Sequence, residues 1–421
     1  MTVTKKELGG RIKAARESCR MTQETVAERL GVSRSSIAQI ESGNRAVSSI
    51  ELDKLAYLFG RDIRDFLGDK PMGGDPLLAL FRSHPDISDQ EELLETLRRC
   101  ISLGRELSNL ERLLGIDRGI GAVTAYSLQN PGTKWEAIQQ GERMSREERR
   151  RLGLGLAPLP NLAEILETQG IRTATELMPS DVSGLTLAEP ELGFFVVTNR
   201  EHGVLRRRFS YAHEYCHVLA DREGKGIISR TGDQKKLVEV RANSFAAGFL
   251  MPEEGVRVFM RSLGKGHEGT RHSAVFDGEE AVPFQARAPK ENQEIKFYDV
   301  VQLAHHFKVS RSAAVFRLLN LGLITKTEME SLMEMDQNGR GNEIAGAMGL
   351  QGPDEVQARN EFMHRFLGLG FEALRRGIIT RSKLKELAGM VGVSPSTIGA
   401  ILSAMGLDEE ESSDDVVLPT E

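Results

Sequence analysis

The sequence predicts a multi-domain, mainly α-helical protein with one small β-sheet. Apolar residues recur at helical spacing through most of the 421 residues, whereas one β-rich run at 194–197 (FFVV) is bounded by turn residues. A Gly- and Pro-rich stretch at 68–76 (GDKPMGGDP) reads as a linker after a first group of short helices. At about 100–200 residues per domain, the length allows two to four domains.

Composition excludes several classes of protein. The net charge is −6, so no strong basic field covers the whole molecule, and binding to nucleic acid requires a local patch. The three cysteines, Cys19, Cys100 and Cys216, are too few and too widely spaced for a disulfide framework. The start of the sequence lacks the apolar core of a signal peptide, and no run of about 18 apolar residues occurs. We therefore expect a cytoplasmic protein that does not cross a membrane.

Residues 1–68 are dense in short amphipathic helical patterns. Thr22 is placed to cap a helix that Gly31 ends, and Ser33 is placed to cap the next, which ends before Gly43. The order of helix, Gly31-Val32-Ser33 turn and helix is typical of a helix-turn-helix domain, whose second helix lies in the major groove of DNA.

The second helix of this pair carries side chains suited to reading bases. Arg suits guanine, Gln suits adenine and Ser is permissive. The predicted base contacts are Arg34, Ser35 and Gln39, and the predicted phosphate contacts are Gln23, Ser36, Asn44 and Arg45. The basic excess of this region is slight, so a helical bundle for protein contacts is the alternative. The prediction is a reader of a double-stranded DNA operator.

The remaining segments divide by composition into four parts. Residues 69–150 are a helical linker, whose heptad-like spacing at 77–114 indicates packing or dimerisation. Residues 151–325 form a central domain that contains a long polar loop at 264–295. Residues 326–407 are a helical region with a second helix-turn-helix pattern at 381–407, and 408–421 form an acidic tail that we expect to be disordered.

The stretch 208–221 (RFSYAHEYCHVLAD) contains two histidines four residues apart. On a helix this spacing places His213 and His217 on one face, where both can bind one metal ion, with Glu214 beside them as a general base. A catalytic zinc site needs a third protein ligand. We expect Glu239 to supply it, since its helix is otherwise rich in apolar and small residues and a buried carboxylate needs a counter-charge. Asn243, one turn later, is placed to hydrogen-bond a ligating histidine.

The metal prediction has a plain alternative, because many His-x-x-x-His pairs are surface or core histidines. Tyr211 and Arg208 flank the site and either stabilise an oxyanion or pack. His202, His305 and His306 lack comparable partners and are expected to be structural or solvated. The expected ion is Zn²⁺, with another divalent ion such as Mn²⁺ as the alternative. Zinc lowers the pKa of its bound water towards about 7, and Glu214 would accept that proton.

The sequence resembles two known families. Residues 22–45 (TQETVAERLGVSRSSIAQIESGNR) are close to the signature of XRE-type, lambda-repressor-like helix-turn-helix domains. That resemblance implies a pairing of Arg16 with Glu41, and regulators that act as dimers, so a homodimer is expected.

Residues 151–325 resemble the ImmA/IrrE-type metallopeptidases. The matching pieces include the segments at 206–219 (RRRFSYAHEYCHVL), 239–252 (EVRANSFAAGFLMP) and 302–324 (QLAHHFKVSRSAAVFRLLNLGLI). The resemblance implies a zincin-like α+β fold, zinc ligands His213, His217 and Glu239, and catalytic Glu214. Cys216 stands where the family usually has Gly, and 264–295 is longer than expected.

Two hypotheses follow. The first is a DNA-binding regulator with a zinc-dependent endopeptidase domain, which cleaves a repressor or antitoxin, or itself, in a stress or phage-related response. The second is a transcription factor whose metal-site domain senses a ligand and does not cut.

Overall fold

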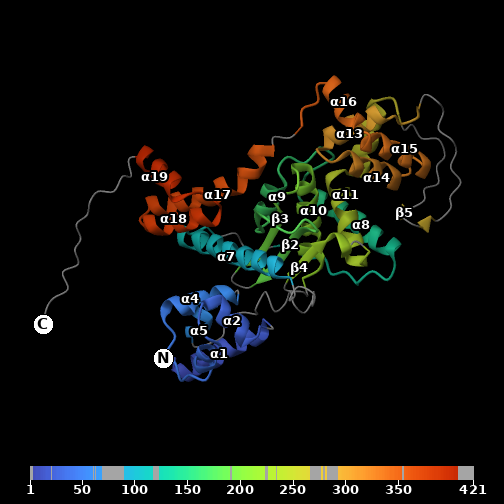
Figure 1. Cartoon of the computed structure of the whole chain (residues 1–421). Coiled ribbons are helices and arrows are strands. Elements are labelled where there is room, and N and C mark those ends of the chain that lie inside the picture. Colours follow the sequence, from blue (N-terminus) through green and yellow to red (C-terminus); the bar gives the residue numbers. More distant parts are fainter. Residues whose placement is uncertain are drawn as a thin grey trace. The chain divides into compact units, whose positions relative to one another are not determined.

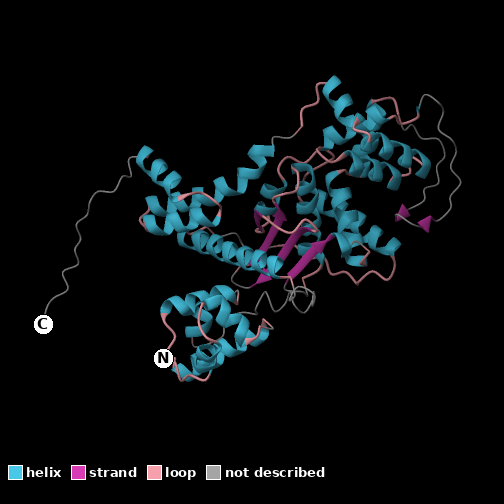
Figure 2. Cartoon of the chain, in the orientation of Figure 1, coloured by secondary structure: helices cyan, strands magenta, loops and turns pink. Residues whose placement is uncertain are grey.

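The computed structural model is mainly helical, with a four-stranded mixed sheet (Figures 1 and 2). The described residues are 3–19, 21–59, 61, 63–68, 90–116, 123–189, 192–222, 226–233, 235–265, 276–277, 280–281, 293–352 and 355–405. All of the expected linker at 68–76 except Gly68, and the acidic tail, lie outside them. Within the described part of the chain, no helix has the length and apolar character needed to span a bilayer.

The N-terminal helices follow the predicted pattern, and two of them begin directly after the predicted capping residues Thr22 and Ser33. They are α1 (Lys5–Ser18), α2 (Gln23–Leu30), α3 (Arg34–Glu41), α4 (Ser49–Leu58) and α5 (Ile63–Leu67). The Thr22 and Ser33 side chains accept the backbone N–H of Thr25 and Ser36, and Gly31 ends α2 with φ 70°. Buried Ile12, Val26 and Ile37 pack the centre of this group.

A buried ion pair holds α1 to the end of α3. Arg16 Nε lies 2.6 Å from Glu41 Oε1, and both side chains are almost fully buried. Gln23 Nε2 donates to the other Glu41 oxygen at 2.8 Å. The pairing of Arg16 with Glu41 that the resemblance implied is therefore confirmed.

The central sheet is built from β1 (Arg172–Glu176), β2 (Val182–Glu189), β3 (Gly193–Asn199) and β4 (Gly226–Arg230), in the order β1-β3-β2-β4. β1 runs parallel to β3, and the other pairs are antiparallel. The predicted strand at 194–197 is β3. The other three strands were not predicted, because β1 and β4 are only five residues long and Gly184 interrupts the apolar pattern of β2.

Helices pack on this sheet and on each other. They are α9 (Leu162–Thr168), α10 (Val204–Ala220), α11 (Leu237–Leu250) and α12 (Glu253–Ser262), preceded by α7 (Glu91–Leu114) and α8 (Lys134–Arg151). α10 contacts β2, β3 and α11. α8 falls in the segment expected to be a linker, yet it packs closely along α11. A Cβ atom at Gly141 would collide with the α11 backbone at Arg241 and Phe245.

The helical pattern returns at residue 297, and the next helices follow it closely. They are α13 (Phe297–Phe307), α14 (Arg311–Asn320), α15 (Lys326–Gln337) and α16 (Arg340–Ala347). Lys308, with φ 53°, caps the C-terminal end of α13, and Ser310 caps the start of α14. Arg311, at the start of α14, forms an ion pair with Asp336 of α15. Of the expected long loop, the structure describes two short strands, β5 (Phe276–Asp277) and β6 (Glu280–Ala281).

A second compact unit comprises 105–117 and 360–421, and its described helices include α18 (Arg381–Met390) and α19 (Pro395–Ala404), with α17 (Glu355–Arg375) leading into it. The turn between α18 and α19 repeats the turn between α2 and α3. Val393 N donates to Ala388 O at 2.9 Å, as Val32 N donates to Ala27 O at 3.0 Å. Gly392 and Gly31 both have positive φ at the same place in the turn.

Candidate functional site

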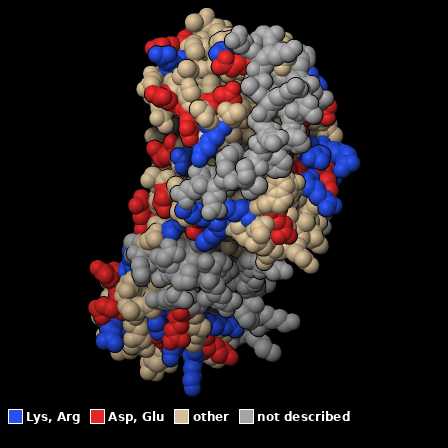
Figure 3. Space-filling model, turned by 90° about the vertical axis from the view of Figure 1, so that its right-hand side faces the viewer, with Lys and Arg blue, Asp and Glu red and all other residues tan. Residues whose placement is uncertain are grey.

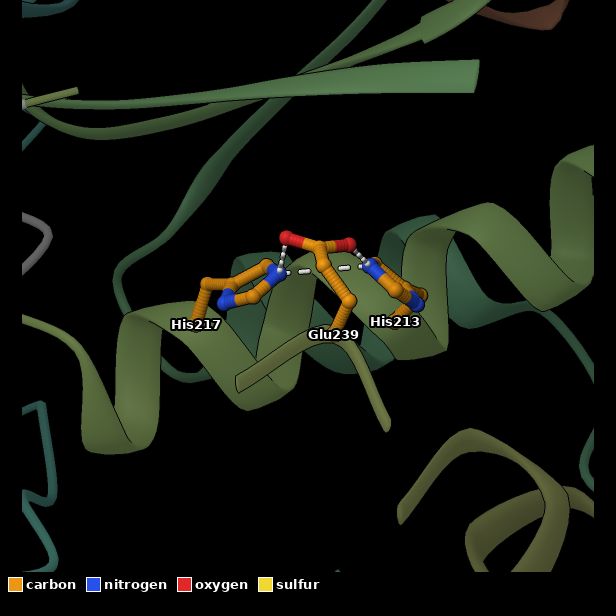
Figure 4. Close-up of side chains that lie close together, drawn as sticks. All are labelled: His213, His217 and Glu239. Carbon is orange, nitrogen blue, oxygen red and sulfur yellow. Dashed lines mark hydrogen bonds and ion pairs between the residues drawn. The ribbon is translucent and has the colours of Figure 1, made fainter. Parts of the chain in front are cut away.

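Two neighbouring helices bring three metal-binding side chains together. His213 and His217 lie on α10, and Glu239 lies at the start of α11, with its carboxylate between the two imidazoles (Figure 4). Glu239 Oε2 is 3.0 Å from His213 Nε2, and Oε1 is 3.4 Å from His217 Nε2. The ligand atoms of all three residues lie within 4.8 Å of one another. The arrangement is a buried His-His-Glu triad.

The hydrogen bonds around the triad fit a cation at its centre. His213 Nδ1 is 2.9 Å from Asn243 Oδ1, and His217 Nδ1 is 2.8 Å from Asp221 Oδ2. Because both partners are acceptors, each Nδ1 carries the proton, and in the neutral ring Nε2 then carries a lone pair. The two Nε2 atoms lie only 3.2 Å apart beside a carboxylate. A divalent ion would satisfy all three groups, and two histidines with one carboxylate are a known zinc ligand set.

The partners of the two histidines are held in turn. Asn243 makes a hydrogen bond to His213, as its position one turn after Glu239 predicted. Asp221 was missed, although its position four residues after His217 is a local signal on a helix. Arg241 forms an ion pair with the second Asp221 oxygen, so Asp221 joins the metal-facing helix to α11. Such outer contacts fix the orientation of a metal-binding imidazole.

When no ion is bound, the residues of the triad shift one another's pKa values. Burial alone would lower the pKa of His217, but the hydrogen bonds to Asp221 and Glu239 outweigh it and raise the pKa to about 10. Burial would raise the pKa of Glu239, yet the hydrogen bonds to His213 and His217 hold it well below its ordinary value. The carboxylate is therefore ionised and ready to bind a cation.

Glu214 lies beside the triad and is fully buried. Its Oε2 atom accepts a hydrogen bond from Thr186 Oγ1 of β2 at 2.6 Å. Its Oε1 atom has no hydrogen-bond partner among the described residues. One oxygen of this carboxylate is thus held while the other is unengaged. Thr186 was not predicted, because it lies 28 residues away in the sequence.

The residues that flank the site pack against the fold, and the remaining predicted histidines lie outside the triad. Tyr211 Oη donates to the carbonyl oxygen of Ala174, and Arg208 donates to backbone carbonyl oxygens that include that of Leu159, so both pack rather than face a reacting group. His202 is buried, His305 lies near the Gln351 carbonyl oxygen, and His306 stacks on Phe259. Cys216 belongs to the apolar core, where burial raises the pKa of its thiol.

The predicted DNA contacts lie mainly at the surface of α3 and the turn after it. Arg34, Ser35, Gln39 and Asn44 are exposed, and Ser36 is partly so. Gln23 is bound to Glu41, and Arg45 is paired with Glu51 at 2.6 Å. Their contacts to bases and phosphates remain predictions. Acidic and basic side chains are interspersed on the face in Figure 3, in line with the absence of a strong overall charge.

Comparisons with known proteins follow the same division. Residues 12–66 match the family model described as Helix-turn-helix, and residues 166–319 match the model described as IrrE N-terminal-like domain. No curated protein matches the chain. The second match spans α10, α11 and all three residues of the triad. The chain therefore combines a helix-turn-helix DNA-binding domain of the XRE type with an IrrE N-terminal-like, metallopeptidase-like domain that carries a His-His-Glu metal-binding triad.

Proposed function

We propose that this protein is a DNA-binding regulator whose central domain is a zinc-dependent endopeptidase. Its substrate would be a repressor or antitoxin-type protein, or the chain itself, in a stress or phage-related response. The observation that carries the proposal is the buried triad with the unengaged Glu214 oxygen beside it. The three cysteines are free thiols, which suits a reducing cytoplasm.

Each residue of the site would have a distinct role in the reaction. His213, His217 and Glu239 would hold the ion, while Asn243 and Asp221 keep the two imidazoles oriented. A bound zinc ion supplies a Lewis acid and lowers the pKa of its water. Glu214 would take the proton from the attacking water and return it to the leaving amine of the cut peptide bond.

The N-terminal domain would bring this centre to an operator. Arg34, Ser35 and Gln39 would meet base edges, and Gln23, Ser36, Asn44 and Arg45 would meet phosphates. A homodimer would present two such helices to a two-fold operator, with half-sites about one helical turn apart.

A non-proteolytic sensor is the second candidate, and one observation favours it. Glu214 has no exposed surface, and the three triad residues are 1–6% exposed. A protein substrate must reach these atoms, whereas a small ligand or the ion itself needs much less room. A sensor would use metal or ligand binding to alter operator binding without cleaving a peptide bond.

One comparison separates the two candidates. Wild type and Glu214→Gln are loaded with zinc, incubated with XRE-type repressors and with no added substrate, and followed by mass spectrometry. We expect fragments from wild type alone, with equal zinc content and equal operator binding in both proteins. If neither protein cuts while a metal-dependent change in operator binding persists, the sensor is the correct assignment.

A further inference from the structure

Two residues of strand β2, Gly184 and Thr186, lie against the carboxylate of Glu214. Gly184 and Thr186 are two positions apart, so they lie on the same face of the strand, and that face meets α10. Thr186 Oγ1 donates to Glu214 Oε2 at 2.6 Å, and Gly184 lies against Oε1. Glu214 is fully buried and Thr186 almost so.

Gly184 is required by space and not by backbone conformation. It is absent from the described residues with positive φ, so other residues could adopt its backbone angles. A Cβ atom at this position would, however, lie 2.5 Å from Glu214 Oε1 and 2.9 Å from Cδ. Any larger residue would therefore push the carboxylate away from its present place.

A neighbouring threonine shows that a buried threonine of this sheet does not have to use its hydroxyl in a hydrogen bond. Thr198 pairs with Gly184 across β2 and β3 and is fully buried. Its Oγ1 atom has no hydrogen-bond partner among the described residues. A buried threonine in this sheet can thus leave its hydroxyl unused, whereas Thr186 directs its hydroxyl to the carboxylate.

We propose that Gly184 and Thr186 form a carboxylate seat that positions Glu214 for its reaction. Thr186 fixes Oε2, and Gly184 leaves room for Oε1, so the carboxylate is held in one orientation while Oε1 keeps no hydrogen bond to the described residues. Both are positioning residues, since each would act on the reaction only through Glu214. The seat deepens the proposed endopeptidase function and rests on it for its catalytic meaning, but the carboxylate's position can be measured without any cleavage.

The test uses the full chain loaded with Co²⁺, whose visible absorption reports ligand binding. The probe is added as acetohydroxamic acid, whose N–H and O–H groups can each donate a proton or a hydrogen bond to a nearby carboxylate when its oxygens bind the metal. The variants are Thr186→Val, which removes the hydroxyl, and Thr186→Ser, which keeps it, with Thr198→Val as the matched control. We expect about tenfold weaker acetohydroxamate binding in Thr186→Val, as in Glu214→Gln, and near wild-type binding in the other two.

The outcomes separate the seat from the proposed function. Unchanged acetohydroxamate binding in Thr186→Val, or an equal loss in Thr198→Val, overturns the seat. If the expected pattern holds but no protein is ever cut, the seat stands and the endopeptidase assignment fails. With a cleaved substrate, Thr186→Val should lower kcat and leave KM unchanged. Should Thr186→Val not fold, Thr186→Ala removes the same hydroxyl with a smaller side chain, and the same loss is expected.

Discussion

The metal centre and helix α3 place their functional side chains in opposite environments. In the centre, each side chain is buried and is held by another, as His217 is by Asp221 and Glu214 is by Thr186. On α3, Arg34, Ser35 and Gln39 face solvent. A buried polar group must find its partner within the fold, so the fold itself reveals the partners. An exposed side chain is open to a partner from outside the fold, so its removal should affect binding more than stability.

The largest effect is expected from the metal. Zinc at about 1,000 times its Kd should stabilise the central domain by about 4 kcal/mol, which corresponds to a Tm increase of roughly 10 °C. A chelator should reverse this in wild type. In Glu239→Ala, which lacks one of three ligands, Tm should not respond to zinc or to the chelator. Differential scanning calorimetry with zinc analysis checks this. An equal response in Glu239→Ala would remove Glu239 from the ligand set.

Within the DNA-binding domain, the nearest counterpart of the metal centre is the pair of Arg16 and Glu41. Glu41→Ala leaves a buried guanidinium without its partner, and we expect a loss of about 3 kcal/mol in the stability of the domain. Arg45→Gln breaks the more exposed pair with Glu51 and should cost less than about 1 kcal/mol. Hydrogen exchange of residues 12–66 in the full chain measures both. Equal losses of stability in the two variants would show that burial does not determine the cost of breaking an ion pair.

The same contrast explains what the sequence could predict. His213, His217 and the caps at Thr22 and Ser33 depend on spacings of three or four residues, so a local pattern indicates them. Glu239 was identifiable because a carboxylate is rare on an apolar helix. The contact of Thr186 with Glu214 joins a strand to a helix, and no spacing in the sequence encodes it.

The sheet shows the same limit. Strands β1 and β4 are stabilised by partners distant in sequence, and their five residues carry little periodic signal. Asp221 is the exception among the missed residues. It lies within one helical turn of His217, so a search for carboxylates beside the second histidine would have found it.

Changes on the exposed face of α3 and in the turn after it should separate binding from stability. Arg34→Ala and Gln39→Ala are each expected to weaken binding to an operator selected from random DNA by about 1–3 kcal/mol and to relax specificity at one position. Arg45→Ala should weaken binding to all sequences and reduce the salt slope by about 1. Tm should stay within about 1 °C for Arg34→Ala and Gln39→Ala. Fluorescence anisotropy at several salt concentrations measures the affinity for DNA and its salt dependence. If Gln39→Ala weakened binding equally for all DNA sequences, Gln39 would be a phosphate contact and not a base contact.

The smallest effect tests the two matching turns against each other. Ser33 caps α3 and Ser394 caps α19, accepting the backbone N–H three residues later at 3.2 and 3.1 Å. Replacing either serine by alanine should cost about 1 kcal/mol in its own helix. The sequence of α19 (PSTIGAILSA) contains neither a charged nor an amide side chain, so it lacks the groups that read guanine and adenine.

Operator binding should therefore weaken in Ser33→Ala and stay unchanged in Ser394→Ala, although the two caps have the same geometry. Hydrogen exchange across each helix reports the loss of the cap, and anisotropy with the selected operator reports binding. A loss of operator affinity in Ser394→Ala, with exchange in 12–66 unaltered, would mean that α19 also contacts DNA. The shared backbone of the two turns would then mark a shared function, despite the difference in their exposed side chains.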